Sequence, residues 1–333
     1  MTIYLNATGT SLPPRVSTLN DIEAGLVQGN IARRTGISST SQADASGAEM
    51  AATAGARAFE NSGLEIGLFK LCLHASAFHQ GYDMWSSAAF VQNEALPGST
   101  ALALDVGQLS NGGLASLEVA EQYLRGSEDP AAALLTAGDR FCLPGVDRWS
   151  TDPGTVFGDG GSAAVFSTTP GLAEVLSIRG LGAPWLERMS RGADAPSDSP
   201  LGHRRPIEIS AGRRLLVEDI GLEELLSVLQ KGQLDAYRSA LSAVDVAPES
   251  ISWHIVPHLG LPKMRHQFLE PLNIDVNQTN WSWGSGVGHL GAGDQWAGLN
   301  WLIESELIRP GDLCAVHGAG GGFYWSCALL RFL

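Results

Sequence analysis

Ser110 stands where a chain could place a nucleophilic hydroxyl. The apolar run at residues 101–106 is typical of a buried strand, small residues surround Ser110, and apolar residues at helical spacing continue to Leu124. At such a strand-to-helix junction, free backbone N–H groups and the positive end of the helix dipole can stabilise an oxyanion. The alternative is that Ser110 only caps the helix.

His258 comes directly after a second strand-like run, residues 252–256, and Pro257. A histidine at the carboxyl end of a strand is well placed to face a cleft in an α/β sheet. A purely structural role for His258 remains the alternative.

His289 stands in a glycine-rich loop, residues 284–293, which ends at Asp294. Because this loop carries few side chains, His289 and Asp294 can fold back toward each other, as a general base and its orienting carboxylate must. Alternatively, Asp294 is only the N-cap of the amphipathic helix predicted over residues 295–306.

Two further segments can bind negative charge. Gly318 to Gly322 lie between two apolar strand-like runs, where free backbone N–H groups can act as donors. The alternative for this segment is a bulged hairpin. Near the N-terminus, Arg33 and Arg34 precede a Thr-Gly turn and could bind a phosphate, or they could belong to a solvated loop.

Composition limits the class of protein. The chain has 333 residues, 44% of them hydrophobic, so it can bury a large core. Its net charge of −14 opposes nucleic-acid binding. We find no apolar run of bilayer length and no secretory segment, so we expect a cytoplasmic protein that does not enter a membrane. The four cysteines show no CxxC spacing, and we expect no metal site.

Strand and helix patterns alternate along the chain and suggest two halves. Residues 1–167 form the predicted N-terminal half, which carries the nucleophile. Residues 168–333 form a connection and a C-terminal half, which carries the histidines. We expect the polar stretch 168–206 to be an irregular connection that covers the active site, and residues 216–244 to be helical.

In their order and spacing, several segments resemble the ketoacyl-acyl carrier protein synthase III branch of the thiolase-like fold, over nearly the whole chain. The matching segments are Arg34 to Ile37, Asp105 to Gly112, Gly158 to Gly160, Pro257-His258, Gly288-His289, and Gly320 to Phe323 with Trp325. The resemblance implies an α/β fold, a thiolase-like five-layer αβαβα sandwich made of two duplicated halves, and a homodimer.

Two departures from the family pattern are physically coupled. The family uses a cysteine nucleophile where this chain has Ser110, and an asparagine where it has His289. A hydroxyl, unlike a thiol, is not ionised near neutral pH and needs a positioned general base. His289 supplies that base, and Asp294 can fix its tautomer. The chain thus resembles the serine-bearing acyltransferases and starter-unit enzymes of polyketide and antibiotic biosynthesis.

The resemblance implies acyl transfer without a cofactor. Ser110 would attack the thioester of an acyl carrier protein or coenzyme A, with His289 as base, and form an acyl-serine. Backbone N–H groups of Ser110 and Gly321 would form the oxyanion hole, and His258 would donate to the carbonyl or the leaving group. The acceptor is left open between a carrier thiol, a hydroxyl and an amine.

The resemblance also assigns donor and partner contacts. Asn30, next to Arg34 in the family's donor site, replaces an aromatic residue that stacks on coenzyme A, so coenzyme A should lose roughly 1–3 kcal/mol. An acyl carrier protein donor is therefore favoured. Lys263 and Arg265 resemble the family's basic docking surface, or are ordinary solvated charges. Trp85 is expected near the dimer contact and the acyl pocket. A polyketide synthase is a further expected partner.

Two other functions stay open. The first is a decarboxylative starter-unit 3-oxoacyl synthase, in which Ser110 is acylated and a malonyl carrier protein is the acceptor. The second is a non-catalytic subunit that binds a carrier protein or a synthase without chemistry.

Overall fold

A mixed sheet of nine strands forms the frame of the protein. The computed structural model describes residues 1–127 and 130–333. The order of strands across the sheet is β5-β4-β6-β7-β1-β8-β11-β10-β9, and β2 pairs separately with β3. The strands are β1 (Tyr4–Ser11), β2 (Arg15–Ser17), β3 (Ser39–Ser41), β4 (Phe69–Ala75), β5 (Leu102–Val106), β6 (Ala132–Asp139), β7 (Gly160–Ser167), β8 (Ala173–Gly182), β9 (Ile251–Ile255), β10 (Leu313–Gly320) and β11 (Tyr324–Phe332).

The helices lie on both faces of this sheet. They are α1 (Thr18–Glu23), α2 (Gly29–Thr35), α3 (Gly47–Ser62), α4 (Ser87–Ala95), α5 (Gly112–Arg125), α6 (Arg188–Arg191), α7 (Ile209–Ile220), α8 (Leu222–Ser242), α9 (Leu261–Met264), α10 (Glu270–Leu272), α11 (Trp281–Gly284) and α12 (Asp294–Glu304). Within the described residues, every helix is too short or too polar to cross a bilayer.

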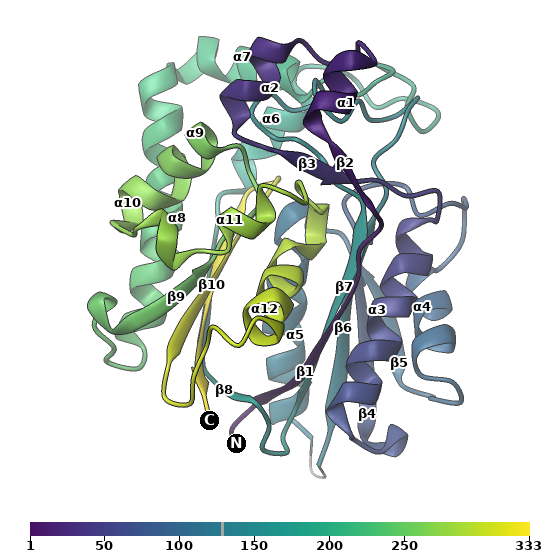
Figure 1. Cartoon of the computed structure of the whole chain (residues 1–333), viewed down its shortest axis with the longest axis vertical. Coiled ribbons are helices and arrows are strands. Elements are labelled where there is room, and N and C mark those ends of the chain that lie inside the picture. Colours follow the sequence, from purple (N-terminus) through teal and green to yellow (C-terminus); the bar gives the residue numbers. More distant parts are fainter. Residues whose placement is uncertain (128–129) are drawn as a thin grey trace.

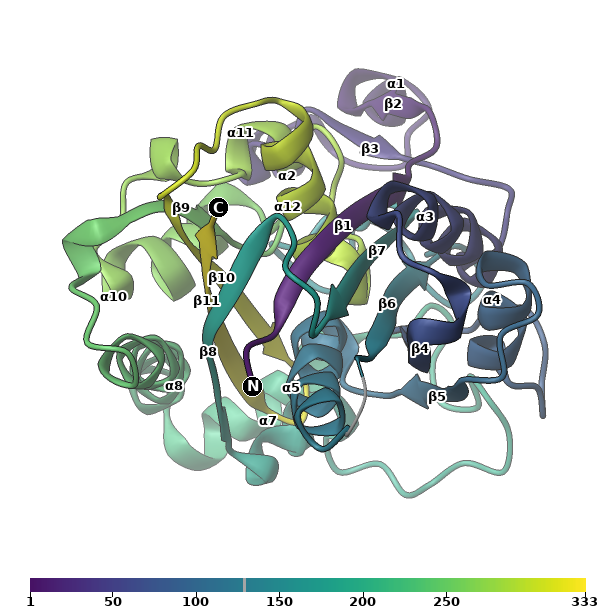
Figure 2. The ribbon, with the colours of Figure 1, turned by 90° about the horizontal axis from the view of Figure 1, so that it is seen from below.

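The sheet bends around α5 and α12, which form the central layer (Figures 1 and 2). β5, β4, β6, β7 and β1 lie on one side of these helices, with α3 and α4 outside them. β8, β11, β10 and β9 lie on the other side, with α8 outside them. This order of layers confirms the predicted αβαβα sandwich.

The two central helices are fixed by apolar side chains buried between the two parts of the sheet. On α5, Leu114, Leu117 and Leu124 are almost fully buried, and on α12 so are Trp296 and Leu299. Burial of each such side chain stabilises the fold by about 1.5–3 kcal/mol. The N-termini of both helices, where Ser110 and Asp294 stand, are therefore held by the core.

The prediction of an irregular connection over residues 168–206 is wrong for its first part. β8 occupies Ala173–Gly182 and pairs antiparallel with β11 and β1. Its buried Ala173 and Val175 alternate with polar and half-buried residues, which hid the strand among polar neighbours. The proposed boundary after residue 167 falls between β7 and β8, and a division into two domains stays a prediction.

The helix predicted over residues 216–244 is interrupted. Gly221 has a φ of 87°, a conformation that favours glycine, and it separates α7 from α8. The break turns α8 along the outer face of β8 and β11.

Two stacked histidines are buried under α8. His254 Nδ1 lies 3.1 Å from His317 Nε2, and their ring centroids are 5.4 Å apart. Burial lowers the pKa of His254 to about 4. Burial, with a smaller effect of His254, lowers the pKa of His317 well below its ordinary value. Both imidazoles are therefore neutral in the folded protein near neutral pH.

These histidines predict acid sensitivity. Below a pH of about 6.5 the unfolded chain takes up protons that the folded chain cannot bind, so stability falls as pH falls. Between pH 7.5 and 5.5, each such histidine should cost about 1.4 kcal/mol of the free energy of unfolding. Urea unfolding at both pH values should show a drop that is smaller by this amount in His317→Gln. The exposed His203 provides a matched control, His203→Gln, which should keep the wild-type drop. An unchanged drop in His317→Gln would contradict the assignment.

Candidate active site

Ser110 is presented by one turn of 3₁₀ helix, Leu109–Asn111, at the N-terminus of α5. Leu109 has a φ of 47°, a left-handed conformation that costs a branched residue roughly 1–2 kcal/mol. Strain of this kind persists where the surrounding structure enforces it, often at functional sites. Here Gln295 Nε2 donates to the Ser110 carbonyl oxygen at 3.2 Å and ties the turn to α12.

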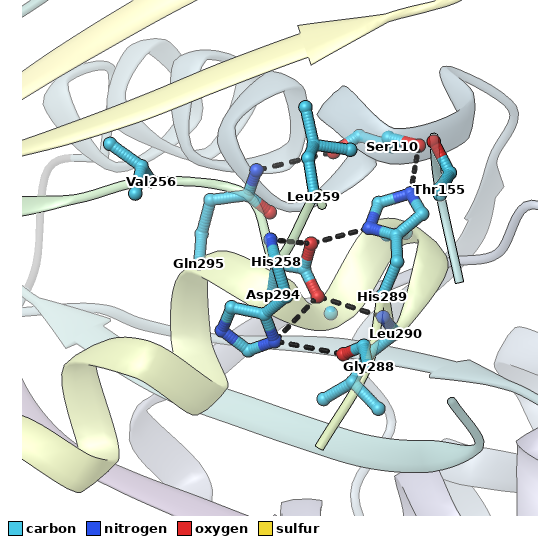
Figure 3. Close-up of polar contacts among 12 residues, drawn as sticks. Ser110, Thr155, Val256, His258, Leu259, Gly288, His289, Leu290, Asp294 and Gln295 are labelled. Atoms are coloured by element: carbon cyan, nitrogen blue, oxygen red, sulfur yellow. Dashed lines mark hydrogen bonds and ion pairs between the residues drawn. The ribbon is translucent and has the colours of Figure 1, made fainter. Parts of the chain in front are cut away.

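Ser110, His289 and Asp294 form one chain of hydrogen bonds (Figure 3). Ser110 Oγ lies 2.7 Å from His289 Nε2, and His289 Nδ1 lies 2.5 Å from Asp294 Oδ2. Because a carboxylate only accepts, His289 carries its proton on Nδ1. His289 Nε2 is left to accept the proton of the Ser110 hydroxyl.

Glycines shape the loop that carries His289. Gly288 and Gly291, on either side, have positive φ values of 85° and 63°. The backbone N–H of His289 donates to Val156 O at 2.8 Å, and its carbonyl accepts from Gly158 N–H at 2.9 Å. A Cβ on Gly158 would lie 2.2 Å from the Val287 carbonyl oxygen, so only glycine allows this close approach.

Asp294 is a fully buried carboxylate at the start of α12. Burial disfavours its charge, but this is outweighed by His258, by His289 and by hydrogen bonds from His289 and the Leu290 N–H, so the pKa of Asp294 lies below its ordinary value. The N-terminal end of the helix also favours a negative charge. Asp294 is therefore ionised near neutral pH and can stabilise a protonated His289.

The side chain of His258 is directed at Asp294. Its backbone N–H donates to Asp294 Oδ2 at 2.8 Å, and its Nδ1 lies 3.1 Å from Asp294 Oδ1 and 3.0 Å from Gly288 O (Figure 3). The fully buried ring packs edge-on against Trp283. The neighbours Pro257 and Leu259 line the cavity at Ser110, but His258 does not. These contacts give no support to donation from His258 to a substrate carbonyl, which stays a prediction.

The contacts of His258 indicate a supporting role instead. Its Nδ1 faces two acceptors and so carries the proton, which it directs at Asp294. Burial lowers the pKa of His258, against the opposing effects of Asp294 and Gly288, and keeps the ring neutral. Asp294 therefore stands between two imidazoles, of which only His289 reaches Ser110.

A cavity of about 550 Å³ opens at Ser110 and His289. Aromatic rings form one wall. The ring centroids of Phe141 and Phe157 are 4.5 Å apart, and those of Phe157 and His289 are 5.7 Å apart. The apolar lining residues are Phe78, Phe141, Val146, Phe157, Ile207, Leu225, Leu229, Phe268 and Phe323. They come from separate loops and helices without a common period, so sequence reasoning missed them.

Gly321 also lines this cavity, in the turn between β10 and β11. It lies against Leu109, since an added Cβ would be 2.6 Å from Leu109 Cδ1. Both residues assigned to the oxyanion hole, Ser110 and Gly321, thus border the same space. Their N–H groups as oxyanion donors remain a prediction.

Polar residues line another part of the cavity. Arg34 belongs to this lining, but Asn30 does not, and Asn30 Oδ1 accepts from the neighbouring Ile31 N–H. Lys263 is not a free docking charge: its side chain is 19% exposed, and Nζ lies 2.6 Å from Asp152 Oδ2.

Asp152 forms ion pairs with two basic side chains at this part of the cavity. It also binds Arg213, with 2.7 Å between nitrogen and oxygen. Burial opposes its charge, but Lys263 and Arg213 outweigh burial and lower the pKa of Asp152 below its ordinary value. Sequence reasoning missed both Asp152 and Arg213. Arg265 is exposed and stays a candidate for docking.

Trp85 lies away from the cavity of its own chain. It stands just before α4, is 37% exposed, and packs against Tyr82 and Phe90. It is not among the residues that line the cavity of its own chain, and its placement near the acyl pocket stays a prediction. A dimer contact at Trp85 remains a prediction. In the described part of the chain, no group of three His, Cys, Asp or Glu residues could hold a metal ion.

Comparison with known proteins points to one family. A family profile for the C-terminal part of 3-oxoacyl-[acyl-carrier-protein (ACP)] synthase III matches residues 241–332. The beta-ketoacyl-[acyl-carrier-protein] synthase III of Synechococcus sp. (strain RCC307) is 28% identical over 347 residues, covering 99% of this chain and 98% of the relative. That of Natranaerobius thermophilus is 25% identical over 338 residues, covering 98% of each.

The chain is also similar to two solved structures. The chain is similar to ChlB3, described as an acyltransferase, with a TM-score of 0.92 and 30% identity over 100% of this chain and 98% of the other. It also shares the fold of 3-oxoacyl-[acyl-carrier-protein] synthase III from Aquifex aeolicus VF5, with a TM-score of 0.78 and 23% identity over 99% and 100% of the two chains.

The supporting role of His258 can be tested by substitution. His258→Leu removes the donor to Asp294 Oδ1, whereas His258→Asn keeps an N–H at this place. We expect the leucine variant to form acyl-enzyme about 10–100-fold more slowly, as for other residues that orient a catalytic group, and the asparagine variant to lose less. Rapid-quench mass spectrometry measures the rate, and thermal unfolding controls for stability. Equal losses in the two variants would contradict the role.

Proposed function

Because the chain belongs to the ketoacyl-acyl carrier protein synthase III-like family of thiolase-fold acyltransferases, we propose that it transfers an acyl group from a thioester through an acyl-serine at Ser110. The observation that carries this proposal is the chain of hydrogen bonds from Ser110 through His289 to Asp294. A serine hydroxyl becomes a nucleophile only when a base takes its proton, and His289 Nε2 lies at the required distance.

The reaction proceeds in two halves. In the first, His289 takes the Ser110 proton and Ser110 Oγ attacks the thioester carbonyl. The bond from carbonyl carbon to sulfur breaks, and the leaving thiolate takes the proton from His289. N–H groups of Ser110 and Gly321 stabilise the oxyanion. In the second, an acceptor gives its proton to His289 and attacks the acyl-serine, the bond from carbonyl carbon to Ser110 Oγ breaks, and His289 returns the proton to Ser110. Asp294 stabilises the imidazolium in both halves without itself taking the proton.

The position of His258 favours transfer over condensation. The family resemblance implies that, in condensing members, a histidine and an asparagine together assist decarboxylation. Here the asparagine is replaced by His289, and His258 is turned toward Asp294 and does not line the cavity. The decarboxylative starter synthase therefore becomes the second candidate. Release of carbon dioxide from a malonyl donor, with a chain two carbons longer, would reinstate it.

The donor is an acyl group on an acyl carrier protein. Asn30 offers no ring for the adenine of coenzyme A, and Arg34 lines the cavity. Arg265 is exposed on a chain whose net charge is −14, so it can steer an acidic carrier locally. Polyketide or antibiotic biosynthesis is the setting that the serine-bearing branch implies, with a polyketide synthase as a partner.

Acylation tests the proposal directly. Intact-protein mass spectrometry after mixing with a panel of acyl donors should show one acyl increment per chain. Ser110→Ala should abolish it, and His289→Ala should slow it at least about 100-fold, as for loss of a general base. Ser190 is a second serine that lines the cavity, so Ser190→Ala is the matched control and should still be acylated. A subunit without chemistry would take no increment, and normal acylation of Ser110→Ala would remove Ser110 as nucleophile.

We also propose that two chains pair through β5. This strand is at one edge of the nine-stranded sheet, and its Leu102 and Leu104 side chains are 50% and 44% exposed. An apolar edge strand of this kind is normally covered. Near it, Trp85 and Tyr82 add further exposed aromatic surface.

Leu104→Glu should shift this dimer toward monomer, because it would bury a charge in the contact. Sedimentation velocity measures the change, and the exposed Leu172, which lies outside β5, supplies the control variant Leu172→Glu. If both variants remained dimeric, the contact between the two chains would not lie at β5. A monomeric wild-type protein would contradict the proposed dimer.

A further inference from the structure

The hydrogen-bonded chain at Ser110 can serve an oxygen leaving group as well as a thiol. A thiol with a pKa of about 8.5 leaves as a thiolate without help. An alcohol has a pKa far above that of a thiol and close to that of water, so it must be protonated as it leaves. His289, 2.7 Å from Ser110 Oγ and backed by the buried Asp294, can hold a proton and return it to a departing oxygen.

The acyl-serine formed at Ser110 is itself an oxygen ester. Transfer of the acyl group from Ser110 to an alcohol exchanges one ester for another, so the two sides are close in free energy. Transfer to a thiol instead makes a higher-energy thioester. The half-reaction with an alcohol therefore runs readily in both directions, which a cysteine nucleophile would not allow.

The surroundings of His289 Nε2 suit a hydroxyl acceptor. His289 is 4% exposed, and Phe157 packs against its ring. The cavity of about 550 Å³ beside it has largely apolar walls, which disfavour bulk water as a competing acceptor. Once Ser110 is acylated, Nε2 can accept a proton only from a group that enters this cavity.

We propose that the acceptor is an alcohol hydroxyl, and that the enzyme also exchanges acyl groups between oxygen esters and alcohols without any thioester. This inference rests on the proposed function. Ser110 Oγ attacks the ester carbonyl, the bond from carbonyl carbon to alkoxy oxygen breaks, and the Ser110 proton passes through His289 to the leaving alkoxide. A second alcohol then gives its proton to His289, attacks the acyl-serine, and Ser110 regains its proton.

The experiment compares matched donors on the full chain. Acetyl, butyryl and benzoyl groups are supplied either as N-acetylcysteamine thioesters or as methyl esters, both without a carrier arm. A group that acylates the protein from its thioester should give the same mass increment from its methyl ester. In trideuteromethanol the unlabelled methyl ester should become labelled, at a rate proportional to enzyme concentration.

Variants of the chain test whether Ser110 carries out the ester exchange. Ser110→Ala should abolish labelling, and the exposed Ser242, at the end of α8, supplies the control Ser242→Ala, which should keep it. Ser110→Cys should lower the ratio of methyl-ester to thioester acylation at least about 100-fold, since the tetrahedral adduct formed with a methyl ester expels the cysteine thiolate, the better leaving group, in preference to methoxide.

Two results would overturn the inference. Acylation of Ser110 by thioesters, without acylation or label exchange from the methyl ester of the same acyl group, would refute the alcohol acceptor and leave the proposed function standing. Passage of the acyl group from Ser110 to a pantetheine thiol or an amine, but not to alcohols, would do the same. Failure of every thioester would instead refute the proposed function, and the inference with it.

Discussion

The carboxylate of Asp294 is the group on which the site depends. It is fully buried, and an unpaired charge in that position would be strongly destabilising. Its partners come from two further segments: His258 follows β9, and Leu290 and His289 belong to the glycine-rich loop. Because each contact satisfies part of the same charge, the carboxylate fixes these segments relative to α12. Its contact with His289 Nδ1 also sets the orientation of the His289 ring.

The nucleophile reaches this carboxylate through the packing of the two central helices. Ser110 and Asp294 are 184 residues apart (294 − 110), yet each precedes or begins a helix whose N-terminus lies between the two parts of the sheet. The close approach needs small residues. A Cβ on Gly112 would lie 2.7 Å from Ala75 Cβ, and one on Gly113 would lie 3.0 Å from Ala292 O. Glycine at these places is a requirement of the site as much as of the fold.

The sequence was sufficient for residues whose position follows from local chemistry. Ser110, His289 and Asp294 stand at helix starts and in a glycine-rich loop, and their hydrogen bonds agree with the prediction. The sequence was insufficient where orientation depends on distant partners. The orientation of His258 is set by its contacts with Asp294 and Gly288. The charge of Lys263 is paired with that of Asp152, which lies 111 residues away in the sequence. The αβαβα layers followed from the family resemblance, whereas β8 was hidden by its polar residues.

The orientation of His258 connects the two departures from the family pattern that the resemblance implies. An imidazole whose N–H is directed at Asp294 cannot at the same time use that proton to polarise a carbonyl in the cavity. In the proposed mechanism, the carboxylate that orients His289 toward Ser110 also holds the N–H of the second histidine. Serine activation and loss of the condensing pair are then one structural change. A single substitution of Ser110 by cysteine would therefore not restore condensation, because His258 would still face Asp294.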